Sequence, residues 1–195
     1  MITTTSTSLL AGLHDRGNER AWGEFDARYH PLLISFGRRL GLAEHDAYDA
    51  AQETLLAFAE AYRQGRYDRE KGRLRTWLYG IATNKIRDLQ RRRAREIVGD
   101  AADRTGLMEQ IPDEHTMSEA WEAEWQAAVL AACTEEVRHQ VEASTMQAFE
   151  LFVLKGRPGE EVAQHLGISR DAVFKAKRRV LTRMREVYDR LQADW

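Results

Sequence analysis

The chain has 195 residues, of which 43% are hydrophobic and 31% are charged, and its formal net charge is −2. That length and composition are typical of a globular protein with one or two domains. Cys133 is the single cysteine, which excludes an internal disulfide, and the six histidines show no ligand spacing, so we expect no metal and no cofactor. No apolar run reaches the length of a membrane span and the N-terminus lacks a secretory signal, so we expect a cytoplasmic protein.

The net charge hides an uneven distribution. Residues 85–95 hold six cations and one acid, residues 100–124 hold eight acids and one arginine, and residues 170–185 hold seven cations and one acid. Two cationic segments, each able to hold phosphates, therefore flank an acidic one. A nucleic-acid partner is compatible with this pattern although the net charge is small.

Helical periodicity dominates the chain, so we expect an all-α protein. Only three prolines occur, at positions 31, 112 and 158, and no β-alternating run stands out. Residues 99–117 are polar, acidic and aperiodic, which is typical of a linker. We therefore predict two helical domains, residues 1–98 and residues 118–195, joined by an acidic linker at residues 99–117.

The segment 45–64 is predicted to be a helix with two distinct faces. Its buried stripe is expected to contain Tyr48, Ala51, Leu55, Phe58, Ala59 and Tyr62. Roughly a right angle around the helix lies a second row, which we call the acidic row: Asp49, Gln52, Glu53, Leu56 and Glu60. An acidic row with an apolar anchor is typical of a protein docking surface. A solvated face with one isolated leucine would give the same pattern, and spacing alone leaves both readings open.

The segment 74–95 is predicted to be a helix with an apolar first half and a basic second half. Its buried stripe is expected to contain Leu74, Leu78, Ile81, Ala82, Ile86 and Leu89. Arginines recur every fourth residue at positions 87, 91 and 95, a spacing suited to a phosphate backbone, and Lys85, Arg92 and Arg93 flank them. Asn84 lies where the halves meet, and its amide could bind the edge of an exposed base. Trp77 and Tyr79 could stack on bases, although we favour a core position for Trp77.

Two helices are predicted between the linker and the C-terminal motif. The first, residues 118–141, places four apolar residues on one stripe: Trp121, Trp125, Val129 and Ala132. The second would open with a capping box at Ser144–Gln147, bury Phe149, Phe152 and Val153, and end at Gly156.

Residues 160–185, EEVAQHLGISRDAVFKAKRRVLTRMR, have the pattern of a helix-turn-helix. Ala163 allows close helix approach, Gly167 suits the tight turn, and Val173 would pack the second helix onto the first. The remaining seam residues are Val162, Leu166, Ile168 and Ala176. Ser169 is the expected N-cap of the second helix, and Asp171 lies in its first turn.

The outward residues of that second helix are mostly cationic: Arg170, Phe174, Lys175, Lys177, Arg178 and Arg179. Such a helix fits the DNA major groove and its phosphate walls, and Phe174 could touch thymine methyl groups. A solvated basic helix in an ordinary bundle is the alternative, which the agreement of seam, turn and charge disfavours.

The run DAYDAAQE at residues 46–53, followed by TWLYGIATN at residues 76–84 and an arginine tail, resembles region 2 of bacterial sigma factors. The basic helix-turn-helix after the acidic linker resembles their region 4. With nothing sizeable between the two, residues 21–191 are similar to the small extracytoplasmic-function class of the sigma-70 family. The second helix of the helix-turn-helix, which we call the recognition helix, departs from the family pattern. Its residues 172–175 are Ala-Val-Phe-Lys, where many members have threonine-valine-lysine-serine. No −35 consensus can therefore be transferred to this chain.

The resemblance implies a sigma factor that binds core RNA polymerase, recognises −35 and −10 promoter elements and promotes DNA melting. It assigns docking on the β′ clamp helices to the acidic row. It assigns the −10 element, with a flipped base held near Asn84, to Asn84, Lys85, Arg87, Asp88, Arg91, Arg92 and Arg95. It assigns the −35 element to Ser169, Arg170, Asp171, Phe174, Lys175, Lys177, Arg178 and Arg179. The other implied partners are the polymerase β flap, promoter DNA and, as a regulator, an anti-sigma factor.

Two other classes of protein compete with this interpretation. A stand-alone helix-turn-helix regulator would share the C-terminal motif but would have no use for a second basic helix and a docking row. An enzyme is disfavoured, because the sequence offers no nucleophile–base set, metal cluster or glycine-rich phosphate loop.

Overall fold

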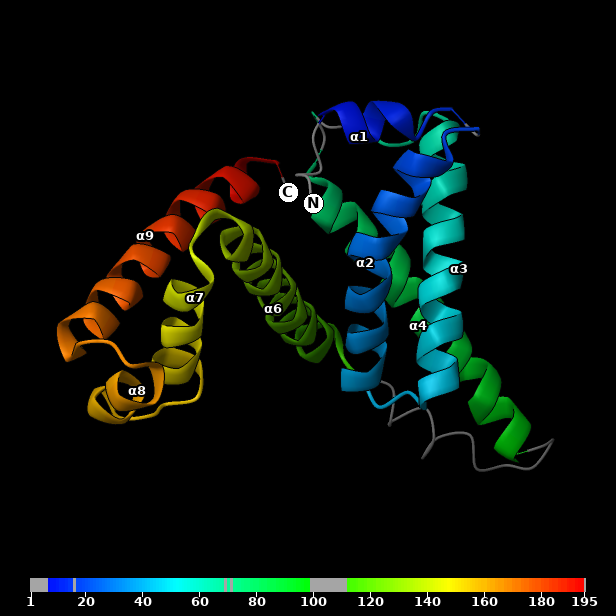
Figure 1. Ribbon diagram of the computed structural model, residues 1–195. Helices are drawn as coiled ribbons and strands as arrows, with labels where there is room; N and C mark the ends of the chain where they lie inside the picture. The colour runs from blue at the N-terminus through cyan, green and yellow to red at the C-terminus, as the bar shows by residue number, and fades with distance from the viewer. Residues whose placement is uncertain (1–6, 16, 69, 71, 99–111, 195) are drawn as a thin grey trace. The chain divides into compact units, whose positions relative to one another are not determined.

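The computed structural model describes residues 7–15, 17–68, 70, 72–98 and 112–194, and every regular element among them is a helix (Figure 1). In chain order they are α1 Thr7–Gly12, α2 Glu19–Arg39, α3 Glu44–Arg63, α4 Leu74–Val98, α6 Glu114–Gln140, α7 Ala143–Phe149, the π-helical turn η1 Glu150–Leu154, α8 Gly159–Leu166 and α9 Arg170–Asp194. The all-α prediction is confirmed. Most of the predicted linker, residues 99–111, lies outside the described residues.

Contacts divide the described chain into two units within α6, after Ala128. The first unit holds α1 to α4 and the first half of α6, and the second holds the remainder of α6 and all that follows. We expected the second domain to begin at residue 118. Residues 118–128 of α6 belong instead to the first unit. Residues 114–117 are helical rather than linker, because the Asp113 carboxylate accepts a hydrogen bond from the Thr116 N–H (2.8 Å) and caps α6.

The core of the first unit is aromatic. In Figure 1, α2 and α3 run side by side and α4 crosses them. The Phe25 and Phe58 rings stack with centroids 4.5 Å apart, and the Trp77 ring lies 5.1 Å from that of Phe58. A Cβ atom on Gly37 would lie 3.2 Å from the Ala47 Cβ, so this glycine permits the close approach of α2 and α3.

The buried face of α3 differs from the prediction. Ala51, Phe58, Ala59 and Tyr62 are buried as expected, but Tyr48 is 50% exposed and Leu55 is only partly buried. The side chains buried in their place are Asp46, Ala47, Ala50 and Thr54. The close packing of α2 and α3 at Gly37 leaves room only for small residues such as Ala47. The half-exposed Tyr48 ring lies beside His30 of α2, with ring centroids 4.9 Å apart. The predicted α4 stripe is buried except for Ile81, which is partly buried.

Two tryptophans hold the first half of α6 in the first unit. The Trp121 ring lies edge-on to that of Phe36, with centroids 5.2 Å apart, and the Trp125 ring lies 6.2 Å from that of Tyr29. Both tryptophans are buried. An ion pair between Arg39 and Glu124 (2.9 Å) adds a polar contact at the edge of this packing.

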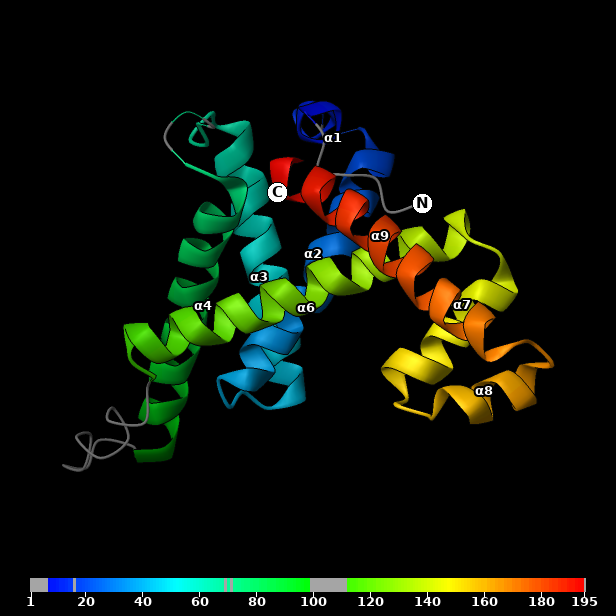
Figure 2. The ribbon, with the colours of Figure 1, turned by 90° about the vertical axis from the view of Figure 1, so that its left-hand side faces the viewer.

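The second unit contains the predicted helix-turn-helix, α8 and α9 (Figure 2). Its seam is buried as expected, with a cluster of Ala148, Leu151, Val162, Ala163, Val173 and Ala176. Gly167 ends α8 with φ +66°, a left-handed conformation that favours glycine. The Ser169 hydroxyl accepts a hydrogen bond from the Ala172 N–H (3.1 Å), as an N-cap does.

The capping box predicted at Ser144–Gln147 is wrong. Helix α7 begins at Ala143, and its N-cap residue, Glu142, makes no side-chain capping hydrogen bond. Because the helix starts before Ser144, that hydroxyl lies in the first turn and not at the cap. Phe149 is buried as expected, while Phe152 and Val153 are partly buried in η1.

Candidate nucleic-acid and protein interfaces

The N-terminal part of α9 carries a cationic surface. Ser169 and Asp171 are exposed at its start, and the exposed cations that follow are Arg170, Lys175, Arg178 and Arg179. Lys177 is partly buried, and Phe174 is 43% exposed. Lys175 pairs with Asp171 at 2.7 Å, but both side chains are more than two-thirds exposed, so this pair holds the lysine only weakly. Seven of the eight residues predicted to bind the −35 element are therefore exposed, and Lys177 is the exception.

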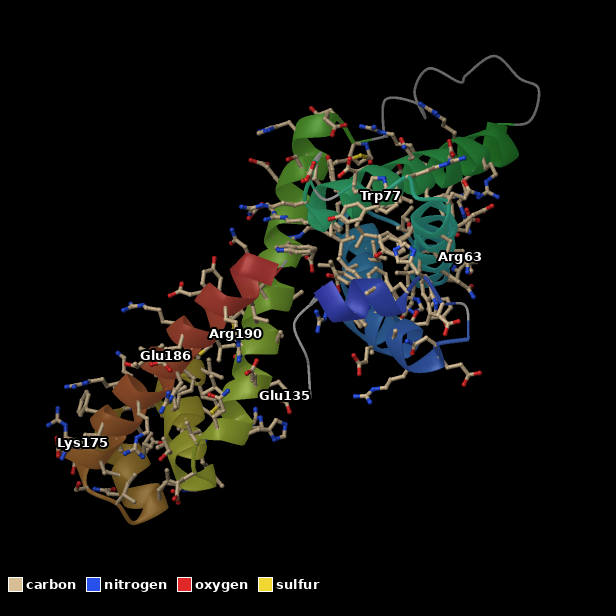
Figure 3. All side chains as sticks on the ribbon, turned by 90° about the horizontal axis from the view of Figure 1, so that it is seen from above. Arg63, Trp77, Glu135, Lys175, Glu186 and Arg190 are labelled. Carbon is tan, nitrogen blue, oxygen red and sulfur yellow. The ribbon has the colours of Figure 1, made fainter. Side chains whose placement is uncertain are left out.

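This cationic surface continues along the helix. A shallow groove beside α9 is lined by Lys175, Arg178, Arg179, Thr182, Arg183 and Glu186. Figure 3 shows Lys175 and Arg190 towards opposite ends of α9. Arg190 forms an ion pair with Glu136 of α6, so the cation near the C-terminal end is paired within the unit while Lys175 faces solvent.

The α4 helix carries the other predicted nucleic-acid surface, and most of its described cations are paired with acids. Asn84 is exposed at the junction of the apolar and basic halves. Arg87 donates to a Glu114 carboxylate oxygen (2.5 Å), and Arg91 lies 3.8 Å from Asp88 on the same helix. The Arg95 side chain lies outside the described residues.

Glu114, the first residue of α6, connects that helix to α4 through two hydrogen bonds. It accepts hydrogen bonds from the Tyr79 hydroxyl (2.7 Å) and from Arg87, which lower the pKa of its carboxyl below the usual range. Burial and the hydrogen bond to Glu114 raise the pKa of Tyr79 to about 12. The Tyr79 hydroxyl is therefore bound to an acid, and its partly buried ring packs against Trp121, with centroids 5.7 Å apart. The Trp77 ring, also partly buried, stacks on Tyr67 with centroids 5.0 Å apart, so both rings pack against other aromatic side chains of the first unit.

The acidic row lies on α3 and is exposed except at Glu53. Leu56 is the most exposed large apolar side chain of the described residues, at 64%, and Asp49, Gln52 and Glu60 are exposed beside it. Glu53 lies 3.3 Å from Lys85 and 3.5 Å from Arg92 of α4. The predicted docking row and the predicted DNA-binding helix thus share Glu53, and phosphates would compete with it for these two cations.

A buried carboxylate ties α3 to the basic end of α4. Asp46 is 4% exposed, and it pairs with Arg93 and lies 3.4 Å from His45. Such a carboxylate needs a partner, because an unpaired buried charge is strongly destabilising. The sequence pattern predicts that Arg93 flanks the arginines that recur every fourth residue on α4, and it predicts no contact for Asp46. Its position four residues before Ala50 and eight before Thr54, both buried, is the signal that it faces inward.

The described residues offer no other evident chemistry. They contain no group of three or more histidine, cysteine, aspartate or glutamate side chains placed to hold a metal ion. Within the same residues, no helix is both long and apolar enough to cross a membrane.

Known proteins resemble this chain over most of its length. Residues 25–96 match the family Sigma-70 region 2. The ECF RNA polymerase sigma factor ShbA of Streptomyces griseus is 32% identical over 196 residues, covering 93% of this chain and 95% of ShbA. The ECF RNA polymerase sigma factor SigD of Mycobacterium tuberculosis is 30% identical over 181 residues, covering 87% of this chain and 78% of SigD.

A third relative matches over a shorter stretch. The RNA polymerase sigma factor CnrH of Cupriavidus metallidurans is 37% identical over 91 residues, which is 46% of each chain. A solved structure of CnrH in complex with the cytosolic domain of CnrY aligns with 95% of this chain and 97% of that chain at 25% identity. Its TM-score of 0.38 is too low to support a conclusion from the superposition.

The similarity to ShbA decides between the classes that the sequence left open. It covers 93% of this chain and 95% of ShbA, so it is not confined to the helix-turn-helix. A stand-alone helix-turn-helix regulator is accordingly set aside. The chain belongs to the extracytoplasmic-function sigma factors of the sigma-70 family, which act in transcription initiation with RNA polymerase.

Proposed function

We propose that this sigma factor, while bound to core polymerase, binds a promoter at two separate elements. We call this arrangement the two-point grip. The acidic row on α3 docks on the β′ clamp helices, α4 binds the −10 element, and α9 binds the −35 element. The observation that carries the proposal is the exposed Leu56, set in an acidic row directly beside the cations of α4. An exposed apolar anchor surrounded by charge is typical of a docking hot spot.

The finer roles of α4 follow from where its polar groups lie. Asn84 is exposed, and an amide can both donate to and accept from a base edge. The cations after it would hold the phosphates of the opened strand, which offsets the few kcal/mol that unstacking a base costs. Before DNA binds, these cations are balanced by Glu53 and Glu114. Breaking these ion pairs on DNA binding costs little free energy, because partly exposed ion pairs contribute little to stability.

We also propose two further protein partners. The second unit would contact the polymerase β flap, and an anti-sigma factor would act as a regulator. The chain would work in the cytoplasm with the polymerase, and the polymerase would supply the catalysis of RNA synthesis.

A footprint of the holoenzyme tests the two-point grip. With the reconstituted holoenzyme, we expect hydroxyl-radical protection of two separate promoter segments, near −35 and near −10. With the chain alone at the same concentration, we expect no comparable protection. Equal protection by the chain alone would contradict the proposal, because it would show operator binding without polymerase.

The Asn84→Ala variant is expected to impair promoter opening more than initial binding. Removing the amide takes away hydrogen bonds to a base that is exposed only after melting, while the phosphate contacts of the closed complex remain. Permanganate footprinting of the melted region should show a loss, whereas the Kd for duplex promoter should change little. Gln140→Ala, which removes an exposed amide of α6, serves as a control. Unchanged permanganate reactivity would refute the base-capture role.

The Arg178→Ala variant is expected to weaken promoter binding in a way that reveals its contact. If Arg178 reaches a base edge, the loss is about 1–3 kcal/mol and is confined to certain −35 sequences. If it reaches a phosphate, the loss is equal on all sequences and the salt slope falls by about 1. Binding measured against salt concentration on two −35 sequences separates these cases, and Arg185→Ala, farther along α9, is the matched control. No loss of either kind would remove Arg178 from the interface.

A further inference from the structure

Two phenylalanine rings meet at the start of α9. The Phe174 ring lies edge-on to that of Phe152 in η1, with centroids 5.2 Å apart and planes at 78°. This geometry is favourable for aromatic pairs and limits the motion of the exposed ring. Gly159 borders both rings, since a Cβ atom there would lie 3.7 Å from each. Phe174 is therefore packed against η1 although 43% of it is exposed.

Two cations lie against the same pair of rings. The Arg170 guanidinium carbon lies 5.7 Å from the Phe174 ring centroid, and the Lys177 ammonium lies 5.5 Å from that of Phe152. Both distances are within the range of cation–π attraction. Phe174 is thus partly exposed between Arg170, which lies over its own ring, and Lys177, which lies over the neighbouring ring of Phe152. An apolar group beside two cations that attract phosphates is suited to an apolar feature on DNA. In the major groove that feature is the C5-methyl group of thymine.

We propose that Phe174 is a specificity-determining residue that reads the C5-methyl group of a thymine in the −35 element. Phe152 is its positioning residue, because it holds the ring without itself lying on the recognition helix. Arg170 and Lys177 bind the phosphates or base edges on either side. The inference rests on the proposed function, in which α9 enters the −35 major groove, and adds which group of which base is read.

Deoxyuridine tests this directly, because it differs from thymidine only by the missing methyl group. The probe is a promoter mapped by transcription with the holoenzyme, in which each −35 thymine on either strand is replaced singly by deoxyuridine. At one position we expect the wild-type holoenzyme to bind about fourfold more weakly, the effect of burying one methyl group. The measurement needs no altered protein, so misfolding cannot account for the result.

Protein variants then identify the residue responsible. With Phe174→Ala, we expect weaker binding to the thymine promoter and no difference between thymine and uracil. With Phe152→Ala, we expect the discrimination to shrink while the charge of the surface is unchanged. Leu181→Ala is the matched control, because Leu181 is also on α9 and is also 43% exposed, and it should keep the fourfold difference.

The results that overturn the inference are distinct from failure of the proposed function. Equal binding to uracil at every −35 thymine, a −35 element without thymine, or a fourfold difference that survives in Phe174→Ala would each overturn it. A holoenzyme that binds and transcribes no promoter would overturn the proposed function itself, and the inference would fall with it.

Discussion

Replacing Leu56 by arginine is expected to abolish binding to core RNA polymerase while the protein stays folded. Leu56 is 64% exposed, so a longer charged side chain there meets solvent and not the core. In the docked state it would place a cation where an apolar anchor should be buried. Loss of an interface hot spot typically costs about 2 kcal/mol or more, which is about thirtyfold in affinity. An unpaired charge buried at the interface adds about 3–5 kcal/mol, so we expect binding to fall below detection. Co-purification with core enzyme and a titrated Kd measure the loss.

Leu130→Arg is the matched control for that variant. Leu130 is 58% exposed on α6 and lies outside the acidic row, so its replacement should leave polymerase binding unchanged. Circular dichroism should show the same helix content for both variants. Retained co-purification by Leu56→Arg would mean that the acidic row is an ordinary solvated face.

The Trp121→Ala variant is expected to destabilise the first unit selectively. Trp121 is 5% exposed and packs against Phe36 and Tyr79, with ring centroids 5.2 and 5.7 Å away. Truncating a buried tryptophan costs about 3–5 kcal/mol. Amide exchange in α2 should therefore speed up by roughly a hundredfold or more, because opening of that helix becomes easier. Exchange measured by mass spectrometry on the full chain gives the result helix by helix.

Phe149→Ala provides the reciprocal variant. Phe149 is 2% exposed in the second unit, so its truncation should speed exchange in α8 and α9 and leave α2 unchanged. If Trp121→Ala instead loosened only α8 and α9, the first half of α6 would belong with the helix-turn-helix, as the sequence suggested.

The helix-turn-helix could be predicted almost residue by residue, because its determinants are local. Gly167 supplies the left-handed turn, Ser169 caps α9, and the seam residues recur at helical spacing. Each of these depends on groups a few residues apart, and a single sequence displays them directly. The capping box at Ser144 failed for the same local reason, since a helix that starts two residues earlier, with Glu142 as its N-cap, removes the cap.

The arrangement of the first unit could not be predicted in the same way. The tryptophans of α6 form a stripe in the sequence, but nothing in their spacing says that Phe36 and Tyr29, about ninety residues earlier, cover them. Likewise, Glu53 reads as a docking acid and Lys85 as a DNA cation until the packing of α3 on α4 brings them together. Long-range packing made these pairs, so they became visible only in the structure.

Transcription by core polymerase with and without the purified chain tests the central claim most directly. With the chain present, we expect new start sites across genomic DNA that share two upstream elements, near −35 and near −10. Leu56→Arg should abolish them all, because the chain would no longer reach the polymerase. The absence of new start sites with the wild-type chain, or sites with a single conserved element, would contradict the two-point grip.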